Sequence, residues 1–128
     1  MKPNYLHLDL KGIIPRFERL LEWLDWFAAC GFTGIVWEYE DRLDWESWPG
    51  LFRPGYTSAQ WARIWKKCRE LNLEVVPLVQ THGHLEWLLK HDRYAGWREN
   101  GCWNEICPRN AEAVAAIQAW LGEVRRLH

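Results

Sequence analysis

Three short segments of the chain have the polarity pattern of β-strands, and they lie at residues 5–11, 33–40 and 73–80. The first alternates apolar and polar residues with a period of two, from Tyr5 to Leu10. Such alternation is typical of a strand that buries one face. The other two segments are rich in β-branched residues, so we predict a strand in each of the three.

Apolar residues at helical spacing separate these strands. They predict helices near residues 15–30, 58–71 and 111–127, and a short helix near 85–90. Thr57 and Gln60 have the spacing of a capping box at the start of the second helix. Asn110 is a typical N-cap for the last one. The chain therefore repeats a strand–helix unit three times.

Strands that alternate with helices in this way are expected to be parallel and joined by right-handed crossovers. A complete eight-fold barrel needs about 250 residues, whereas this chain has 128. The fold class predicted is α/β, with residues 1–128 forming one domain. This domain is either a small open sheet or the N-terminal three βα units of an incomplete (β/α)₈ TIM barrel.

Composition narrows the classes of partner. Lys and Arg number 16 against 17 Asp and Glu, which gives a net charge of −1. A balanced charge gives no electrostatic reason to expect nucleic acid or an anionic membrane as partner. The chain has neither a long apolar span nor an apolar run after its first residues, so we expect a cytoplasmic protein. The four cysteines are expected to be reduced thiols, with Cys102 and Cys107 as the one candidate disulfide.

Tryptophan is unusually frequent, at 11 residues. We expect seven or eight of these to pack in the core or on helix faces, because a buried indole contributes a large apolar area. The remaining ones favour a carbohydrate site, where a flat ring stacks on the apolar face of a sugar. Trp45, Trp48 and Trp103 are the candidates for stacking because they lie in predicted loops.

Polar side chains gather where the predicted strands end. Asp9 and Lys11 end the first strand, and Glu38, Glu40 and Asp41 end the second. Charges at the carboxyl ends of parallel strands are costly in a core, but they are what a site at the top of an α/β fold requires. We therefore predict a binding site there. His7 lies deeper in its strand and is equally well explained as a hydrogen-bonded interior histidine.

The third strand is followed by Gln80, His82 and His84. Two interpretations of the histidines compete. They could ligate a divalent metal together with a nearby carboxylate, or one of them could hydrogen-bond a carboxylate and tune a catalytic acid. Two histidines are only two ligands, so the second interpretation is favoured.

Three strings of the sequence, at residues 7–12, 37–41 and 77–86, together resemble the first three strand ends of a known catalytic barrel. The family is glycoside hydrolase family 20, the β-N-acetylhexosaminidases, and its hexosaminidase D-like branch is the most similar. The resemblance implies a (β/α)₈ barrel that removes terminal N-acetylhexosamine with retention, by attack of the substrate's own acetamido oxygen. It implies no metal or organic cofactor, and an N-acetylhexosaminide as the partner.

The resemblance also assigns roles to individual residues. Lys11 stands where many members have an arginine that holds sugar hydroxyls. Asp41, or Glu40 in its place, and His84 stand where the family has a carboxylate and a histidine that support the general acid. The substrate-binding residues expected on this basis and from the strand-end pattern are Asp9, Lys11, Glu38, Glu40, Gln80, His82, Trp45 and Trp103.

One part of the family's pattern is absent. The family's catalytic Asp-Glu pair follows the fourth strand, and no Asp-Glu dipeptide occurs in these 128 residues. We therefore expect no catalytic residue and no hydrolysis from this chain alone. Two alternatives remain: a non-catalytic half-barrel that binds sugar or associates through its exposed strand edges, and a metal-dependent hydrolase that uses His82 and His84.

Overall fold

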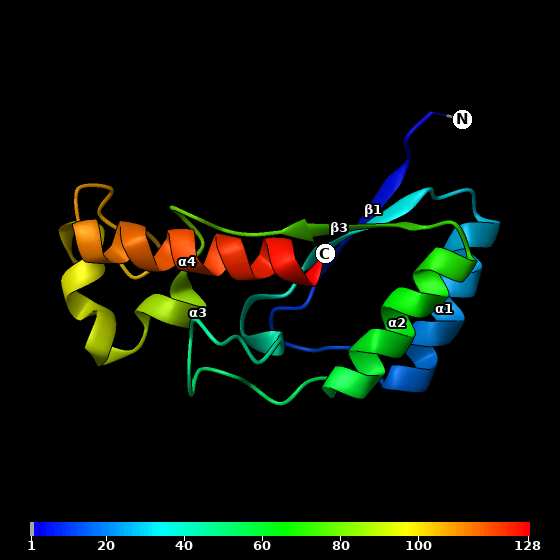
Figure 1. Cartoon of the computed structure of the whole chain (residues 1–128), viewed down its shortest axis with the longest axis horizontal. Helices are drawn as coiled ribbons and strands as arrows, with labels where there is room; N and C mark the ends of the chain where they lie inside the picture. The colour runs from blue at the N-terminus through cyan, green and yellow to red at the C-terminus, as the bar shows by residue number, and fades with distance from the viewer. Residues whose placement is uncertain (1) are drawn as a thin grey trace. The chain divides into compact units, whose positions relative to one another are not determined.

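A computed structural model describes residues 2–128 of the chain. Its sheet contains β1 (Tyr5–Asp9), β2 (Gly34–Glu38) and β3 (Glu74–Leu78), in the order β1-β2-β3 with both pairs parallel (Figure 1). The α/β fold predicted from the sequence is confirmed. Each strand stops two residues earlier than predicted, so Lys11, Glu40 and Gln80 lie in the segments that follow the strands.

The helices alternate with these strands. They are α1 (Phe17–Ala29), η1 (Glu40–Arg42), α2 (Ser58–Glu70), α3 (Glu86–Leu89), η2 (Asp92–Trp97), η3 (Glu99–Gly101) and α4 (Ala111–Leu127), where η denotes a short 3₁₀ helix. The capping box of Thr57 with Gln60 is present at α2, and the Asn110 side chain caps α4. No helix within residues 2–128 is long and apolar enough to cross a membrane.

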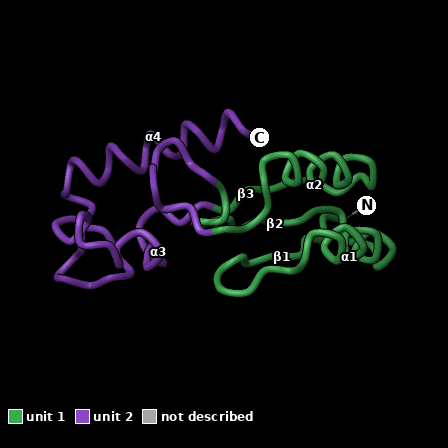
Figure 2. Tube along the Cα trace, turned by 90° about the horizontal axis from the view of Figure 1, so that it is seen from below, with its two compact units in different colours: residues 1–43, 54–78 green, residues 44–53, 79–128 purple. Residues whose placement is uncertain are grey.

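The chain divides into two compact units (Figure 2). Unit 1 comprises residues 1–43 and 54–78, and unit 2 comprises residues 44–53 and 79–128. The three strands, α1 and α2 belong to unit 1. The shorter helices after β3 and the long helix α4 belong to unit 2. Whether residues 1–128 behave as a single domain stays a prediction.

Unit 1 is built around one face of its sheet. Trp37 and Tyr39 on this face are stacked at 6.2 Å, and the Trp61 ring of α2 meets Trp37 edge-on at 5.7 Å. Trp37 thus packs against α2. Because side chains alternate along a strand, the opposite face of the sheet carries the side chains of the intervening residues. The strand register aligns Tyr5 with Gly34 and Asp9 with Glu38 across β1 and β2.

Gly34 is required by a close contact on that second face. A Cβ atom there would lie 2.6 Å from two ring atoms of Tyr5. The missing side chain lets the Tyr5 ring cross β2, and the Tyr5 hydroxyl donates a 2.5 Å hydrogen bond to Glu74 on β3. One glycine therefore allows a contact that links both outer strands of the sheet.

Unit 2 has a different core, made of aromatic rings and few regular hydrogen-bonded elements. Trp48 contacts the rings of Trp87, Trp97 and Trp120, with centroids about 6 Å apart in each pair. The segment that carries Trp48 is held to α4 by Glu123. Its carboxylate accepts hydrogen bonds from the backbone N–H of Glu46 and Ser47 and from the Ser47 hydroxyl.

Burial of tryptophan follows the expectation. Seven of the eleven indoles are buried, which agrees with the seven or eight expected from packing: Trp37, Trp45, Trp48, Trp61, Trp87, Trp97 and Trp120. Cys30, Cys68, Cys102 and Cys107 are all free thiols. Burial in unit 1 raises the pKa of the Cys68 thiol to about 11, so this group stays protonated at neutral pH.

Candidate functional site

Four charged side chains predicted from the sequence meet where β1 and β2 end. Lys11 is at the centre: its Nζ lies 3.0 Å from Glu38 Oε1, 3.3 Å from Glu40 Oε1 and 3.8 Å from Asp9 Oδ2. Glu38 and Glu40 are nearly inaccessible, at 2% and 5% exposed. We call Asp9, Lys11, Glu38 and Glu40 the strand-end cluster.

His7 joins this cluster from the middle of β1. Its Nε2 lies 2.9 Å from Oε2 of Glu38, so Glu38 is held through one oxygen by His7 and through the other by Lys11. The His7 side chain is 48% exposed. His7 is hydrogen-bonded, as expected for an interior histidine. Its side chain is nevertheless on the exposed face of the unit 1 sheet and not in the interior.

The cluster shifts the pKa of two of its members. Burial raises the pKa of Glu40 to about 7, although the neighbouring Lys11 opposes this shift. Burial also disfavours the charge of Lys11, but its hydrogen bond to Glu38 and the charges of Glu40, Glu38 and Asp9 outweigh that effect and raise its pKa. Near neutral pH the cluster therefore holds a fixed cation beside a carboxyl group that can exchange a proton.

The local backbone directs these side chains toward one another. Oδ1 of Asp9 accepts the backbone N–H of Lys11 at 2.8 Å, which bends the chain directly after β1. Glu40 has a positive φ of 47°, a conformation that is uncommon for a residue with a side chain. It lies in η1 together with Asp41, which is 2% exposed. The supporting role of Asp41 stays a prediction.

The predicted residues that follow β3 lie in unit 2. His82 and His84 are exposed and Gln80 is half-buried. His84 has a φ of 57°, and the carbonyl of His82 accepts the N–H of Ile106. His82 also lines an apolar pocket of about 230 Å³ between the 81–82 segment and α4. The binding and supporting roles of these three residues stay predictions.

Two tryptophans predicted to stack on a sugar have very different surroundings. Trp45 is only 4% exposed and packs edge-on against Trp120 at 5.7 Å. Trp48 is 2% exposed inside the same cluster of rings. Rings covered in this way present little surface to a ligand, so the structure disfavours a stacking role for either. Trp103 is 61% exposed, with the Arg98 guanidinium 5.8 Å above its ring, and it keeps its predicted role.

The metal-dependent alternative gains no support from the described part of the chain. Residues 2–128 contain no group of three or more His, Cys, Asp or Glu side chains placed to hold a metal ion. Within the strand-end cluster the carboxylates already surround the ammonium of Lys11, so these oxygens have a cationic partner.

Sequence reasoning missed Arg42. This buried residue donates from its guanidinium to the carbonyls of Leu10, Gly12 and Pro54. It follows three acidic residues within four positions, so the sequence shows only a charge in an acidic loop. No periodicity or motif marks an arginine that binds backbone carbonyls.

Sequence comparisons find relatives of the chain. The chain is 38% identical over 126 residues to hexosaminidase D of Homo sapiens, a match that covers 96% of the chain and 26% of that protein. It is also 38% identical to hexosaminidase D of Bos taurus, of which it covers 36%. The chain is therefore similar to hexosaminidase D over almost all of its own length. It spans well under half the length of these relatives, and no protein-family model matches it.

Solved structures share the fold of this chain. The family 20 β-N-acetylhexosaminidase of Streptomyces coelicolor matches 98% of the chain with a TM-score of 0.78 at 21% identity. A mutant β-hexosaminidase of Streptomyces plicatus in complex with the product GlcNAc matches with a TM-score of 0.79 at 20% identity. The chain covers 31% and 30% of these two proteins. The family resemblance is confirmed, and the fold corresponds to part of a larger barrel.

Proposed function

We propose that the chain forms the N-terminal part of a β-N-acetylhexosaminidase-like barrel and contributes half of its sugar-binding site. The observation that carries this proposal is the position of Lys11, which is held by buried carboxylates at the carboxyl ends of β1 and β2. Ligands of parallel α/β folds bind at this end of the strands. The homology to hexosaminidase D supplies the class of substrate, a terminal N-acetylhexosamine.

Within this proposal the strand-end cluster binds sugar hydroxyls. Lys11 donates to hydroxyl oxygens, while Asp9 and Glu40 accept from hydroxyl protons. A lysine is a compact charge on a flexible stem and cannot form the two-pronged contact of a guanidinium. The direction of the Lys11 ammonium therefore depends on the carboxylates around it. Glu38 fixes this direction through the 3.0 Å contact. Charge-assisted hydrogen bonds of this kind are about twice as strong as neutral ones.

The chemical step is assigned to residues outside these 128. In the proposed mechanism the substrate's acetamido oxygen attacks the anomeric carbon, and a glutamate next to an acetamido-orienting aspartate protonates the leaving oxygen. Asp41 and His84 support that glutamate. Because the chain contains no Asp-Glu dipeptide, we expect it to bind sugar without hydrolysing it.

Calorimetric titration of N-acetylglucosamine into the 128-residue chain tests the proposal. Binding is expected for the wild type and is expected to be lost in Lys11→Met. The control is Lys66→Met, which removes an exposed lysine paired with Glu70 on α2 and should bind like the wild type. Equal binding by both variants would contradict the role of Lys11. Release of nitrophenol from a nitrophenyl N-acetylglucosaminide would show that the chain holds its own general acid.

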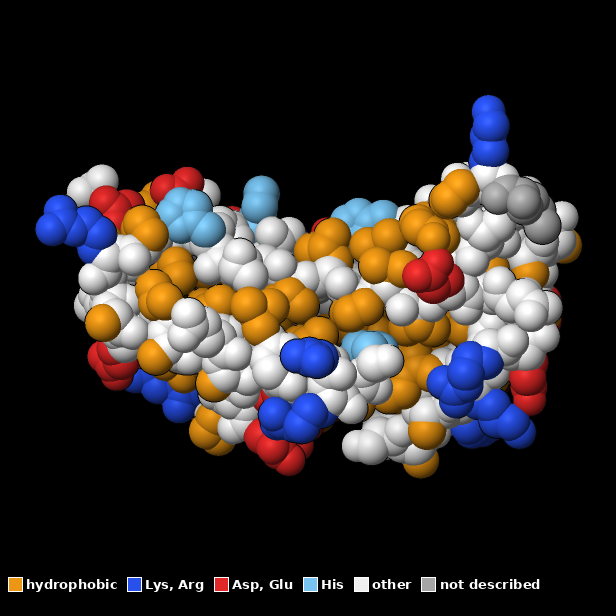
Figure 3. Space-filling view, turned by 45° about the horizontal axis from the view of Figure 1, so that its top comes forward, with side chains coloured by type: hydrophobic (Ala, Val, Ile, Leu, Met, Phe, Trp, Pro, Cys, Tyr) orange, Lys and Arg blue, Asp and Glu red, His pale blue; other side chains and the backbone are white. Residues whose placement is uncertain are grey.

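The edges of the sheet favour a second, compatible role. Within the described chain β1 and β3 each pair with one strand only, and the residues of β3 after Glu74 are all half-buried. Hydrophobic side chains also reach the surface on the face that Figure 3 shows. Such edges are sites for association with a further strand, so self-association or docking of the remaining barrel strands is proposed here. Sedimentation velocity measures this directly, and a monomer at all concentrations would exclude self-association.

A further inference from the structure

Arg42 makes an unusual set of contacts for an arginine. It is 6% exposed. Its Nε donates to the carbonyl of Leu10 at 3.1 Å, its Nη1 donates to that of Pro54 at 2.8 Å, and its Nη2 donates to that of Gly12. A guanidinium presents its donors in a rigid planar fork. Three carbonyls bound to one fork are therefore fixed relative to one another.

Two of these carbonyls flank Lys11. Leu10 precedes it and Gly12 follows it, so the guanidinium holds the main chain on both sides of the residue at the centre of the cluster. Gly12 has a φ of 69°, the left-handed conformation that glycine adopts without strain. Asp9 binds the N–H of Lys11 itself. The peptide groups around Lys11 thus have three anchors.

Arg42 is in turn held by its own surroundings. Its backbone N–H donates to the carbonyl of Tyr39 at 2.9 Å, and its carbonyl accepts the indole N–H of Trp61 at 3.4 Å. These contacts tie the residue to the segment directly after β2 and to α2. The guanidinium therefore transmits the position of these elements to the loop after β1.

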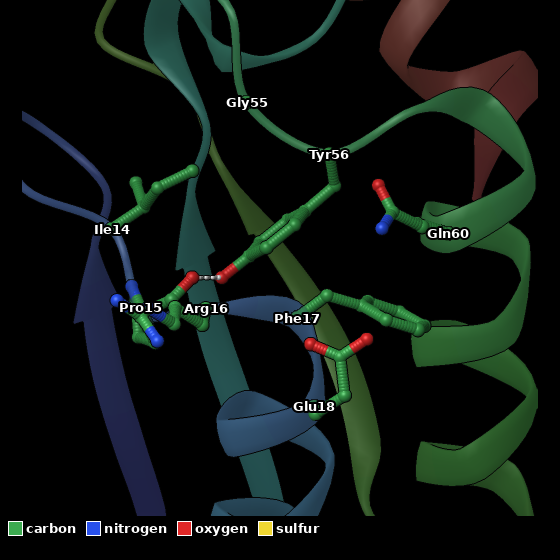
Figure 4. A pocket seen from close by; sticks show the side chains of 8 residues that line it. All are labelled: Ile14, Pro15, Arg16, Phe17, Glu18, Gly55, Tyr56 and Gln60. Atoms are coloured by element: carbon green, nitrogen blue, oxygen red, sulfur yellow. Dashed lines mark hydrogen bonds between the residues drawn. The ribbon is translucent and has the colours of Figure 1, made fainter.

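The loop before α2 is tied to the loop after β1 by a second contact. The hydroxyl of Tyr56 donates to the carbonyl of Pro15 at 2.5 Å, as the dashed line in Figure 4 marks. Gly55 lies close to Arg42, because a Cβ atom at this position would be 3.3 Å from the Arg42 carbonyl oxygen. With Pro54 bound by the guanidinium, the two loops are joined at two points.

We propose that Arg42 is the positioning residue of the site: by holding the carbonyls of Leu10 and Gly12, it places the ammonium of Lys11 among Glu38, Glu40 and Asp9. The consequence for sugar binding rests on the proposed function. Geometry and not charge is what Arg42 supplies, because a lysine at this position would keep the charge but lack the planar fork that binds three carbonyls at once.

Two variants and one control test this inference on the full 128-residue chain. Arg42→Lys keeps the charge, and Arg42→Met keeps the apolar stem. Ile64→Val is the control, because it removes one methyl group from the buried face of α2 and so lowers stability without removing any of the contacts that hold Arg42. The measurements are the pKa of the Lys11 ammonium, from nitrogen-15 NMR of the lysine side chains, and the affinity for N-acetylglucosamine. Lys11→Met identifies the Lys11 resonance.

In the wild type the Lys11 pKa is expected above its ordinary value, because the carboxylates of the cluster favour the charged form. It should fall toward the ordinary value in both Arg42 variants and stay raised in Ile64→Val. Affinity for N-acetylglucosamine should fall roughly tenfold in both Arg42 variants. If Arg42 only supports the fold, all three variants should be less stable than the wild type. The Lys11 pKa should then be the same in the Arg42 variants as in the control.

An unchanged Lys11 pKa in folded Arg42→Lys would overturn the inference. If neither Arg42 variant folds, the wild type still decides: the Arg42 Nε–H should exchange slowly with solvent, and fast exchange would overturn the inference. A wild type that does not bind N-acetylglucosamine would refute the proposed function alone, since the response of the Lys11 pKa to Arg42 does not require a sugar.

Discussion

The two units of the chain differ in how much regular structure they contain and in where their charged side chains gather. In unit 1 the strands and helices satisfy the backbone, and the polar side chains Asp9, Lys11, Glu38 and Glu40 gather at the strand ends. In unit 2 little regular structure precedes α4, and rings around Trp48 form a large part of the core. Parallel strands thus bring charged side chains together at their ends, whereas the irregular segments of unit 2 meet in a cluster of rings.

Buried donors of the two kinds behave differently. The buried guanidinium in unit 1 binds three backbone carbonyls. The buried indole nitrogens of Trp37 in unit 1 and of Trp48, Trp87 and Trp120 in unit 2 make no hydrogen bond within the described chain. Their rings meet edge-on, an arrangement that places the positive edge of one ring against the negative face of another. Ring contacts therefore contribute to the core of both units.

The largest expected effect comes from removing the central ring of unit 2. Trp48→Ala deletes contacts with three other indoles and should lower the free energy of unfolding by about 3 to 5 kcal/mol. Urea denaturation followed by circular dichroism measures the change. Hydrogen exchange should show the greatest loss of protection in residues 79–128. A change below about 1 kcal/mol would contradict the importance of the ring cluster.

The raised pKa of Glu40 gives unit 1 a pH dependence of its own. The folded state binds this proton more tightly than the unfolded state, since the folded pKa is about 7 and the ordinary value is 4.5. Stability should therefore fall as the pH rises from about 4.5 to 7, by roughly 1 kcal/mol per unit, and then stay constant as far as Glu40 is concerned. Glu40→Gln should remove this part of the slope. Urea midpoints measured at several pH values for both proteins test this prediction. Equal dependence of the midpoint on pH in the two proteins would contradict the assignment to Glu40.

A smaller effect is expected from the carboxylate that holds the Trp48 segment. Glu123→Ala leaves the N–H groups of Glu46 and Ser47 without their acceptor, at a cost of about 1 to 2 kcal/mol. The matched control is Arg126→Ala, because Arg126 makes an exposed 3.8 Å ion pair with Glu46 and should change stability by less than about 0.5 kcal/mol. Thermal denaturation compares the two variants. Equal effects would show that Glu123 contributes no more than a surface charge.

The smallest effect on stability is expected for Trp103→Ala. This ring is 61% exposed, so its loss should change the free energy of unfolding by less than about 0.5 kcal/mol. If the ring stacks on sugar as predicted, affinity for N-acetylglucosamine falls while stability does not. Calorimetric titration and urea denaturation on the same sample separate the two quantities. Unchanged affinity would remove Trp103 from the site.

The sequence by itself determined the elements and the chemistry of the strand ends. Period-two and helical spacing located the strands and the longer helices, because burial of one face imposes these periods on a chain. The charges that follow β1 and β2 were recognisable as well. Parallel strands bring their carboxyl ends to one edge, so Asp9, Lys11, Glu38 and Glu40 had to lie near one another once the fold was known.

Only the tertiary structure decided which partner each of these groups has. The burial of Trp45 and Trp48 depends on rings contributed by segments up to 75 residues away, such as Trp120, and no local pattern encodes such contacts. The positive φ of Glu40 and the three carbonyls bound by Arg42 likewise arise from the meeting of separate loops. Periodicity reports which face of an element is buried; it carries no information about which distant backbone group a buried donor will meet.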